Sequence, residues 1–217
     1  MFDVQFARRQ MIEQQVRAWE VLDLRVLEAL QQVPREEFAP PGFREIAFAD
    51  TQVPLAHGQV MLAPKVEGRI LQALDIHPDE DALEIGTGSG FFAACMGRLA
   101  HSVRTIDIFP DFVAAATAAF ARTGAHNVTA ATADAMQFAE RDAYDVIAVT
   151  GSLPVYDARF ERALKVGGRL FVTVGTGPIL EARRVTRTGP GEWLQESLFE
   201  SGMPPLIHAT EPPKFVF

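Results

Sequence analysis

The sequence predicts an α/β fold built on a Rossmann-like, doubly wound and mostly parallel β-sheet with an N-terminal helical addition. From residue 82 onward, short apolar runs alternate with helical patterns, as in βαβ units. A turn with three glycines separates the first of these strands from the next helix. The 217 residues, 48% of them hydrophobic, suit a single domain. We expect residues 1–75 to hold helices and a functional loop, and residues 76–217 the core.

The first 75 residues predict helices separated by an irregular segment. Apolar residues recur at helical spacing over 2–20. Asp23 can cap a second, short helix, which Pro34 ends. Residues 38–64 are rich in proline and glycine, and long irregular segments in compact domains are often functional. A further helix is expected over 65–74.

The remaining residues predict the alternating elements of the core. Five apolar runs have the length and composition of strands, and two segments between them have helical patterns. The expected strands are 82–85, 103–108, 128–132, 144–149 and 169–174, and the expected helices are 90–100 and 111–122.

The composition narrows the classes of partner and compartment. A net charge of -8 repels phosphate backbones, so nucleic acid is not an expected partner. The single cysteine, Cys95, excludes an internal disulfide and a cysteine-based metal site, and it is expected to be a packed helix residue. No metal-ligand spacing occurs, so no metal is expected. No apolar run reaches eighteen residues and the N-terminus is charged, which indicates no membrane span and a cytoplasmic protein.

The glycine-rich turn indicates a nucleotide-type ligand. Gly86, Gly88 and Gly90 follow a strand and open a helix, and glycine lets a ligand approach the backbone closely. The dinucleotide pattern G-x-G-x-x-G would need a glycine at position 91, where Phe91 stands, and no P-loop lysine follows. A dinucleotide oxidoreductase is therefore a distant alternative.

Two acidic residues follow the next two strands. Asp107 ends the second strand, where a carboxylate can accept both hydroxyls of a ribose, and Asp134 follows the third, where it can meet the amine of an adenine. In this order and spacing, the turn and the acids resemble the class I S-adenosylmethionine-dependent methyltransferases. The expected cofactor-binding residues are Glu84, Gly86, Thr87, Gly88, Ser89, Gly90, Asp107, Ile108, Asp134 and Ala135.

Further strings along nearly the whole chain resemble the protein-L-isoaspartate O-methyltransferases. They include a Met-Ile-Glu-Gln-Gln-Val-Arg helix, a Val-Pro-Arg-Glu-Glu-Phe segment and a Pro-Leu-Ala-His-Gly-Gln loop, beginning at Met11, Val33 and Pro54. The resemblance implies methyl transfer to the free α-carboxylate of isoaspartyl residues in damaged proteins or peptides, by a monomer or weak homodimer. A carboxylate is ionised at pH 7, so this reaction needs no general base and no metal.

One segment departs from the family pattern. Where the family typically reads Thr-Ile-Ser-Ala/Gln-Pro, with the serine near the reacting carboxylate, this chain has Val60-Met61-Leu62-Ala63-Pro64. Leucine cannot donate a hydrogen bond to a carboxylate, so acceptor use is expected to be weak or altered. The expected residues at the reacting carboxylate are Leu62, Gln59 and Thr150, and those expected around the substrate are His57, Val60, Met61 and Leu62.

Two alternatives stay open at this point. The apolar segment around Leu62 could accept an apolar small molecule or peptide in place of an isoaspartyl residue. The chain could also be a non-catalytic relative that binds the cofactor or a partner through its tail, 212–217. The simpler interpretation of that tail, which we favour, is a last strand or a segment docked on the core.

Overall fold

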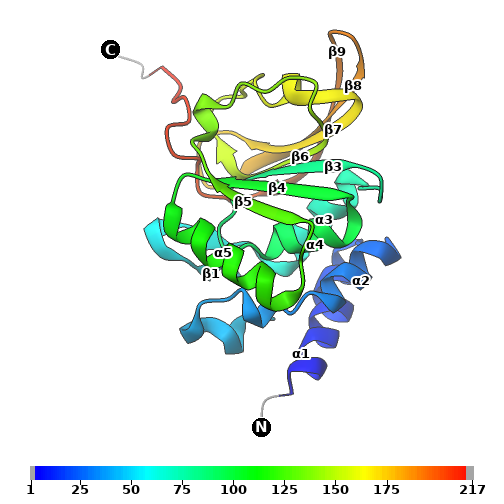
Figure 1. The fold of residues 1–217 in the computed structure, drawn as a ribbon, viewed down its shortest axis with the longest axis vertical. Coiled ribbons are helices and arrows are strands. Elements are labelled where there is room, and N and C mark those ends of the chain that lie inside the picture. The colour runs from blue at the N-terminus through cyan, green and yellow to red at the C-terminus, as the bar shows by residue number, and fades with distance from the viewer. Residues whose placement is uncertain (1–2, 214–217) are drawn as a thin grey trace.

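A computed structural model describes residues 3–213 and shows a seven-stranded sheet with helices packed beneath it (Figure 1). The α-helices are α1 (Val4–Met11), α2 (Leu24–Gln32), α3 (Pro64–Leu74), α4 (Phe91–Leu99) and α5 (Pro110–Thr123). The strands are β1 (Val53–Pro54), β2 (Val60–Met61), β3 (Asp81–Ile85), β4 (Ser102–Asp107), β5 (Val128–Thr132), β6 (Tyr144–Leu153), β7 (Leu164–Val174), β8 (Leu180–Gly189) and β9 (Glu192–Ser201). The predicted core elements are confirmed, and their observed ends lie within two residues of the predicted ones. The exceptions are β6 and β7, which extend further.

The order of the strands places the ligand site. The sheet runs β5-β4-β3-β6-β7-β8-β9, and the five strands from β5 to β7 are parallel. From β3 the chain adds β4 and then β5 on one side of that strand. It then crosses back and adds β6 on the other side of β3. This reversal between β3 and β6 is a topological switch point, where open α/β sheets bind ligands at the carboxyl ends of their strands.

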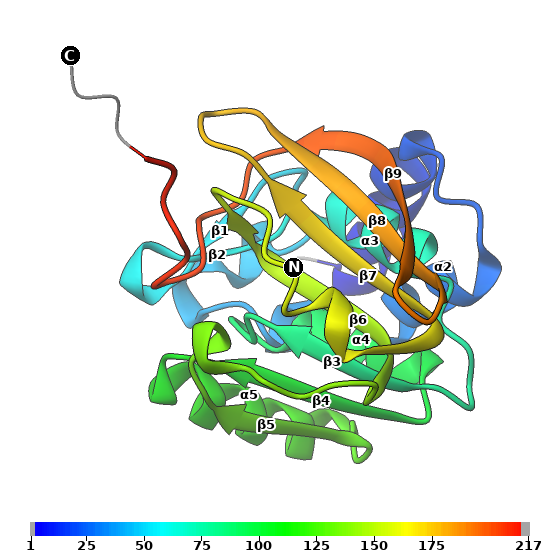
Figure 2. The same cartoon turned by 90° about the horizontal axis from the view of Figure 1, so that it is seen from above.

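The last two strands, β8 and β9, were not predicted from the sequence. They form an antiparallel hairpin that extends the sheet beyond β7. Figure 2, from above, shows this hairpin at the edge opposite β5. The expected mostly parallel sheet is confirmed, with an antiparallel edge.

The two faces of the sheet are covered differently. One apolar cluster joins α2, α3 and α4 to sheet residues such as Val103, Val146 and Phe171. The other cluster covers the opposite face through shorter segments, which contribute Phe138 and Phe160. Figure 1 shows α3, α4 and α5 together below the sheet.

The N-terminal segment is helical, as predicted. Residues 4–19 form α1 followed by one turn of π-helix and one of 3-10 helix, and Asp23 caps α2 through the backbone N–H of Arg25. The irregular segment contains short 3-10 turns, among them Arg35–Glu37, Pro41–Ile46 and Ala56–Gly58, and the small hairpin β1–β2. Cys95 is completely buried in α4, as expected.

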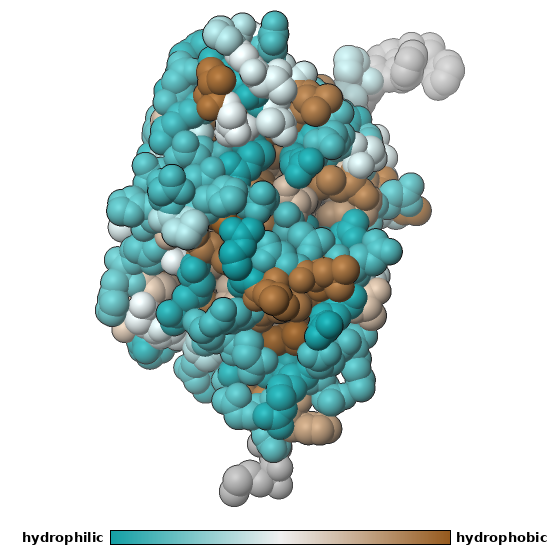
Figure 3. Space-filling model, turned by 90° about the vertical axis from the view of Figure 1, so that its right-hand side faces the viewer, coloured by the Kyte–Doolittle hydropathy of each residue, from teal (hydrophilic) through white to brown (hydrophobic). Residues whose placement is uncertain are grey.

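The surface shown in Figure 3 is mostly hydrophilic, with apolar side chains gathered in a few patches. Within residues 3–213, no helix is both long and apolar enough to cross a membrane. The end of the predicted tail, 214–217, lies outside the described residues, and residues 211–213 have no regular secondary structure.

Candidate functional site

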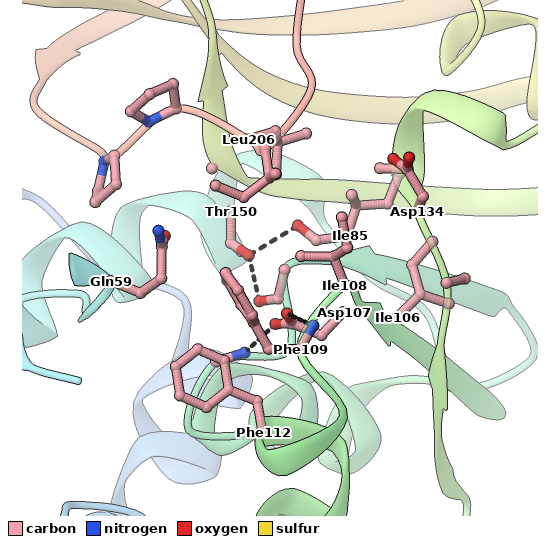
Figure 4. A pocket seen from close by; sticks show the side chains of 18 of the residues that line it. Gln59, Ile85, Ile106, Asp107, Ile108, Phe109, Phe112, Asp134, Thr150 and Leu206 are labelled. Carbon is pink, nitrogen blue, oxygen red and sulfur yellow. Dashed lines mark hydrogen bonds between the residues drawn. The ribbon is translucent and has the colours of Figure 1, made fainter. Parts of the chain in front are cut away.

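A cavity opens at the switch point (Figure 4). Its walls come from the ends of the central strands, from the start of α5, from the loop before β2 and from a C-terminal segment. The lining residues are Gln59, Val60, Ile85, Gly86, Gly88, Ile106, Asp107, Ile108, Phe109, Phe112, Ala133, Asp134, Ala135, Thr150, Gly151, Pro204, Pro205, Leu206 and Ile207.

The glycine turn forms the floor of this cavity. Gly86 has φ +104°, and a Cβ at this position would lie 2.8 Å from the hydroxyl oxygen of Thr150. That hydroxyl donates to the carbonyl oxygens of Ile85 and Gly86, at 3.0 and 2.8 Å, and so joins the ends of β3 and β6. Gly88 also has a positive φ, +49°. The turn therefore exposes bare backbone to a ligand.

Gly90, the third glycine of the turn, lies next to a neighbouring helix. It lines neither this cavity nor the inner one described below, and a Cβ on it would lie 2.8 Å from Cβ of Ala116 in α5. Its missing side chain lets α5 pack against the start of α4. Phe91 likewise points into the core, against Phe38 and under the guanidinium of Arg35, so its bulk does not shape the cavity.

Asp107 stands at the carboxyl end of β4, as predicted, and its side chain is 8% exposed. One carboxylate oxygen accepts from the backbone N–H of Gly88 at 2.9 Å, and the other accepts from that of Phe109 at 3.0 Å. Burial raises the pKa of Asp107, although these hydrogen bonds oppose the shift. Because a carboxylate has about four acceptor positions, Asp107 keeps acceptor capacity for the hydroxyls of a ligand.

Asp134 and Ala135 line the wall beyond β5. Asp134 accepts from the backbone N–H of Met136 at 2.8 Å, and its second oxygen lies 3.0 Å from Nδ1 of His208. Burial raises the pKa of Asp134, but these two partners outweigh it and the net shift is downward. Ile108 lies next to Asp107 in the same wall, so the structure brings four predicted residues together.

A second, inner cavity lies next to the first and shares Val60, Gly86, Gly88 and Thr150 with it. Its remaining lining residues are Met61, Leu62, Glu67, Glu84, Thr87, Ser89 and Phe92. The predicted residues Glu84, Thr87 and Ser89 therefore face this inner space.

Two buried carboxyl groups give the inner cavity its chemistry. Glu84, 1% exposed, accepts from the hydroxyl of Thr105, and burial raises its pKa well above the ordinary range. Glu67, 2% exposed, forms a buried ion pair with Arg35, and burial raises its pKa to about 7. No lysine or arginine of residues 3–213 lines either cavity. The described walls of both cavities therefore offer no positively charged side chain to a ligand.

The loop that was expected to meet the substrate does lie at the cavities. Val60 lines both, while Met61 and Leu62 line the inner one and are almost completely buried. The backbone carbonyl of Leu62 accepts from Arg35 at 2.6 Å. The wall therefore has aliphatic side chains where the family pattern has hydroxyls.

The polar residues predicted near the acceptor are dispersed. Gln59 lines the main cavity, and its side chain donates to the carbonyl of His57 at 3.3 Å. His57 lies outside both linings, stacked on Phe109 with ring centroids 4.0 Å apart, and its Nε2 is 3.0 Å from Asp111. The structure thus places Gln59 and Thr150 at the main cavity, and His57 at its outer edge.

Sequence reasoning missed the C-terminal wall of the cavity. Residues 204–207 cross the end of β6: Ser152 donates its N–H to the carbonyl of Pro204, and Leu206 donates its N–H to that of Ser152, both at 2.9 Å. In Figure 4, Leu206 lies above Thr150, on the opposite side of the cavity from Phe112. The proline pair and the apolar residues after it were the only signal in the sequence.

Comparisons with known proteins agree with this geometry. The family model "Protein-L-isoaspartate(D-aspartate) O-methyltransferase" matches residues 7–208. A protein-L-isoaspartate O-methyltransferase 2 of Pelobacter propionicus is 33% identical over 207 residues, which are 94% of this chain and 92% of the relative. A protein-L-isoaspartate O-methyltransferase of Rhodopseudomonas palustris is 35% identical over 201 residues, or 92% of each.

Solved structures show the same fold. One is a putative protein-L-isoaspartate O-methyltransferase from Plasmodium falciparum in complex with S-adenosyl-L-homocysteine, with a TM-score of 0.78 at 18% identity. The match covers 95% of this chain and 99% of that one. A second protein-L-isoaspartate O-methyltransferase has a TM-score of 0.75 at 21% identity, covering 91% of this chain and 65% of the other.

Proposed function

This chain belongs to the protein-L-isoaspartate(D-aspartate) O-methyltransferase family, and we propose that it methylates the free α-carboxylate of isoaspartyl residues in proteins or peptides, with S-adenosyl-L-methionine as the donor. The observation that carries this proposal is that the main and inner cavities lie side by side at the glycine turn, where both are lined by Gly86, Gly88 and Thr150. One compartment can hold the donor while the acceptor approaches from the other side.

The residues present fit the donor. We assign its nucleoside to the main cavity, with the free acceptor positions of Asp107 toward the ribose and Asp134, Ala135 and Ile108 around the base. The donor supplies an electrophilic methyl group on a positively charged sulfonium. The carboxylates of Asp107 and Asp134 and the lack of lysine or arginine in the described lining favour a positively charged ligand in the main cavity.

The chain's own contribution is then to bind, orient and exclude water. An ionised carboxylate needs no general base, so most of the rate comes from holding it in line with the methyl group. Val60 and Leu62 form an aliphatic wall, and Gln59 and Thr150 are the polar side chains next to it. We propose these four as the acceptor contacts, with Met61 beneath them and His57 at the edge.

A second candidate function keeps the donor and changes the acceptor. The aliphatic wall at Val60 and Leu62 favours it, because an apolar acceptor would bury its surface there without leaving a charge unpaired. We propose that the chain acts as one domain in the cytoplasm, as a monomer or weak homodimer. The net charge of -8 supports a protein or peptide partner over nucleic acid.

Two measurements test these assignments. Calorimetry should detect S-adenosyl-L-homocysteine binding, and no binding at millimolar ligand would refute the donor site. Methyl transfer should then be compared on a peptide with one isoaspartyl residue and on the same peptide with ordinary aspartate. We expect transfer to the isoaspartyl peptide alone. Donor binding with transfer to neither peptide would favour a changed acceptor or a non-catalytic relative.

A further inference from the structure

Arg35 is a fully buried arginine that lines neither cavity but contacts two residues that line the inner one, Leu62 and Glu67. It lies in the 3-10 turn Arg35–Glu37, and its guanidinium has four partners from distant parts of the chain. Nε donates to the carbonyl of Ala47 and Nη2 to that of Leu62, each at 2.6 Å. Nη1 donates to the carboxylate of Glu67. One partner, Leu62, therefore lies in the segment 53–63 that was expected to meet the substrate, which we call the acceptor loop.

The same guanidinium also lies over the ring of Phe91, the residue that follows the glycine turn. Its central carbon is 4.6 Å from the centroid of the Phe91 ring, and Phe91 is the first residue of α4 after that turn. Arg35 thus joins the acceptor loop, at Leu62, to the helix that begins at the donor turn. Only a planar fork can reach carbonyls, a carboxylate and a ring face at once.

A stability role alone does not explain this arrangement. Burying a guanidinium and a carboxylate costs desolvation, so a buried ion pair is weak evidence for stability. Here the pair fixes a backbone atom in the cavity wall, because the carbonyl of Leu62 accepts from the guanidinium that Glu67 orients. The pairing of β1 with β2, each two residues long, the stacking of His57 on Phe109 and the burial of Met61 and Leu62 are further restraints on the loop.

We propose that Arg35 is a positioning residue for methyl transfer: with Glu67 and Phe91 it holds the carbonyl of Leu62 and so fixes the acceptor loop relative to the donor turn. This inference rests on the proposed function, since it assumes that Val60 to Leu62 face the acceptor. It assigns no contact with the ligand to Arg35 itself.

The chain contains a matched control. Arg169 donates to the carbonyls of Leu74 and Asp75 and to the carboxylate of Glu80, so it makes the same kinds of hydrogen bond. It is absent from the lining of both cavities. Arg35→Lys and Arg169→Lys each keep the charge and lose the fork, and their melting temperatures show how far each is destabilised.

The test compares the two variants below their melting temperatures. For Arg35→Lys we expect kcat/KM for an isoaspartyl peptide to fall at least tenfold, while the Kd for S-adenosyl-L-homocysteine changes less than threefold. We expect hydrogen exchange of residues 53–63 to accelerate. For Arg169→Lys we expect kcat/KM within threefold of wild type and unchanged exchange in this segment.

Each other outcome has a defined meaning. Unchanged exchange over 53–63 in Arg35→Lys would overturn the proposal, as would faster exchange with unaltered kcat/KM. Equal losses of kcat/KM in both variants would show that Arg35 acts through stability alone. A wild-type chain that methylates no isoaspartyl peptide but shows the expected exchange would refute the proposed acceptor, while supporting the hold of Arg35 on the loop.

Discussion

The buried carboxyl of Glu67 makes stability depend on pH in a direction opposite to that of most acids. Its pKa is about 7 in the folded protein, against 4.5 for an ordinary glutamate, because burial outweighs the attraction of Arg35. The folded state therefore binds this proton more tightly than the unfolded state. The resulting stabilisation is complete below pH 4.5 and is lost as the pH rises through 7.

The size of the effect follows from the difference between the two pKa values. At about 1.4 kcal/mol for each pKa unit, it amounts to about 3 kcal/mol. Glu67→Gln removes the titrating group and keeps its shape. We expect the difference in unfolding free energy between wild type and Glu67→Gln to shift by about 3 kcal/mol between pH 4.5 and pH 8, with wild type losing stability relative to the variant.

Urea unfolding of both proteins at half-unit steps of pH measures this difference. Carboxyl groups whose pKa is lowered, such as Asp145, contribute equally to the stability of both proteins. Their contribution to the pH dependence therefore cancels in the difference between the two. Glu45→Gln, a change at an exposed residue, serves as the control and should stay parallel to wild type. The reasoning would be refuted if the difference in unfolding free energy between wild type and Glu67→Gln stayed constant within about 1 kcal/mol from pH 4.5 to pH 8.

Three further changes probe the site directly. Leu62→Ser restores a hydroxyl to the inner cavity and should raise kcat/KM for an isoaspartyl peptide severalfold in a methyl-transfer assay; no gain would favour a changed acceptor. Asp107→Asn should weaken S-adenosyl-L-homocysteine binding by roughly ten- to a hundredfold in calorimetry, the value of a hydrogen bond to a charged group. Unaltered affinity would show that Asp107 does not bind the donor. Gly86→Ala places a Cβ 2.8 Å from the Thr150 hydroxyl at a positive φ. It should cost about 1–3 kcal/mol of unfolding free energy and weaken donor binding, and a neutral result in both measurements would show that the turn adapts.

The donor side of the site could be predicted from the sequence because its signals are local. A strand, a glycine turn and a helix lie next to one another in the chain, and Asp107 ends the adjacent strand, where parallel topology places it at the same edge. Gly90 shows the limit of this reasoning. It looks like its neighbours in the turn, but its role depends on Ala116 in another helix.

The acceptor side could be predicted only in part, since its contacts join distant residues. Arg35 and Leu62 are 27 positions apart, and Ser152 and Leu206 are more than 50 apart. No spacing rule links such pairs in one sequence. The hairpin β8–β9 was missed for another reason: polar and charged residues interrupt the apolar ones in β8, and β9 has no buried residue, so neither strand has a long apolar run.

The hold of Arg35 on the loop has a consequence for how this enzyme can change over evolutionary time. The guanidinium binds a backbone carbonyl, and every amino acid at position 62 supplies the same carbonyl. Side chains there can be exchanged while the path of the chain is preserved. A scaffold of this kind allows acceptor preference to drift by single substitutions, and the aliphatic wall of this chain is one sequence that such a scaffold permits.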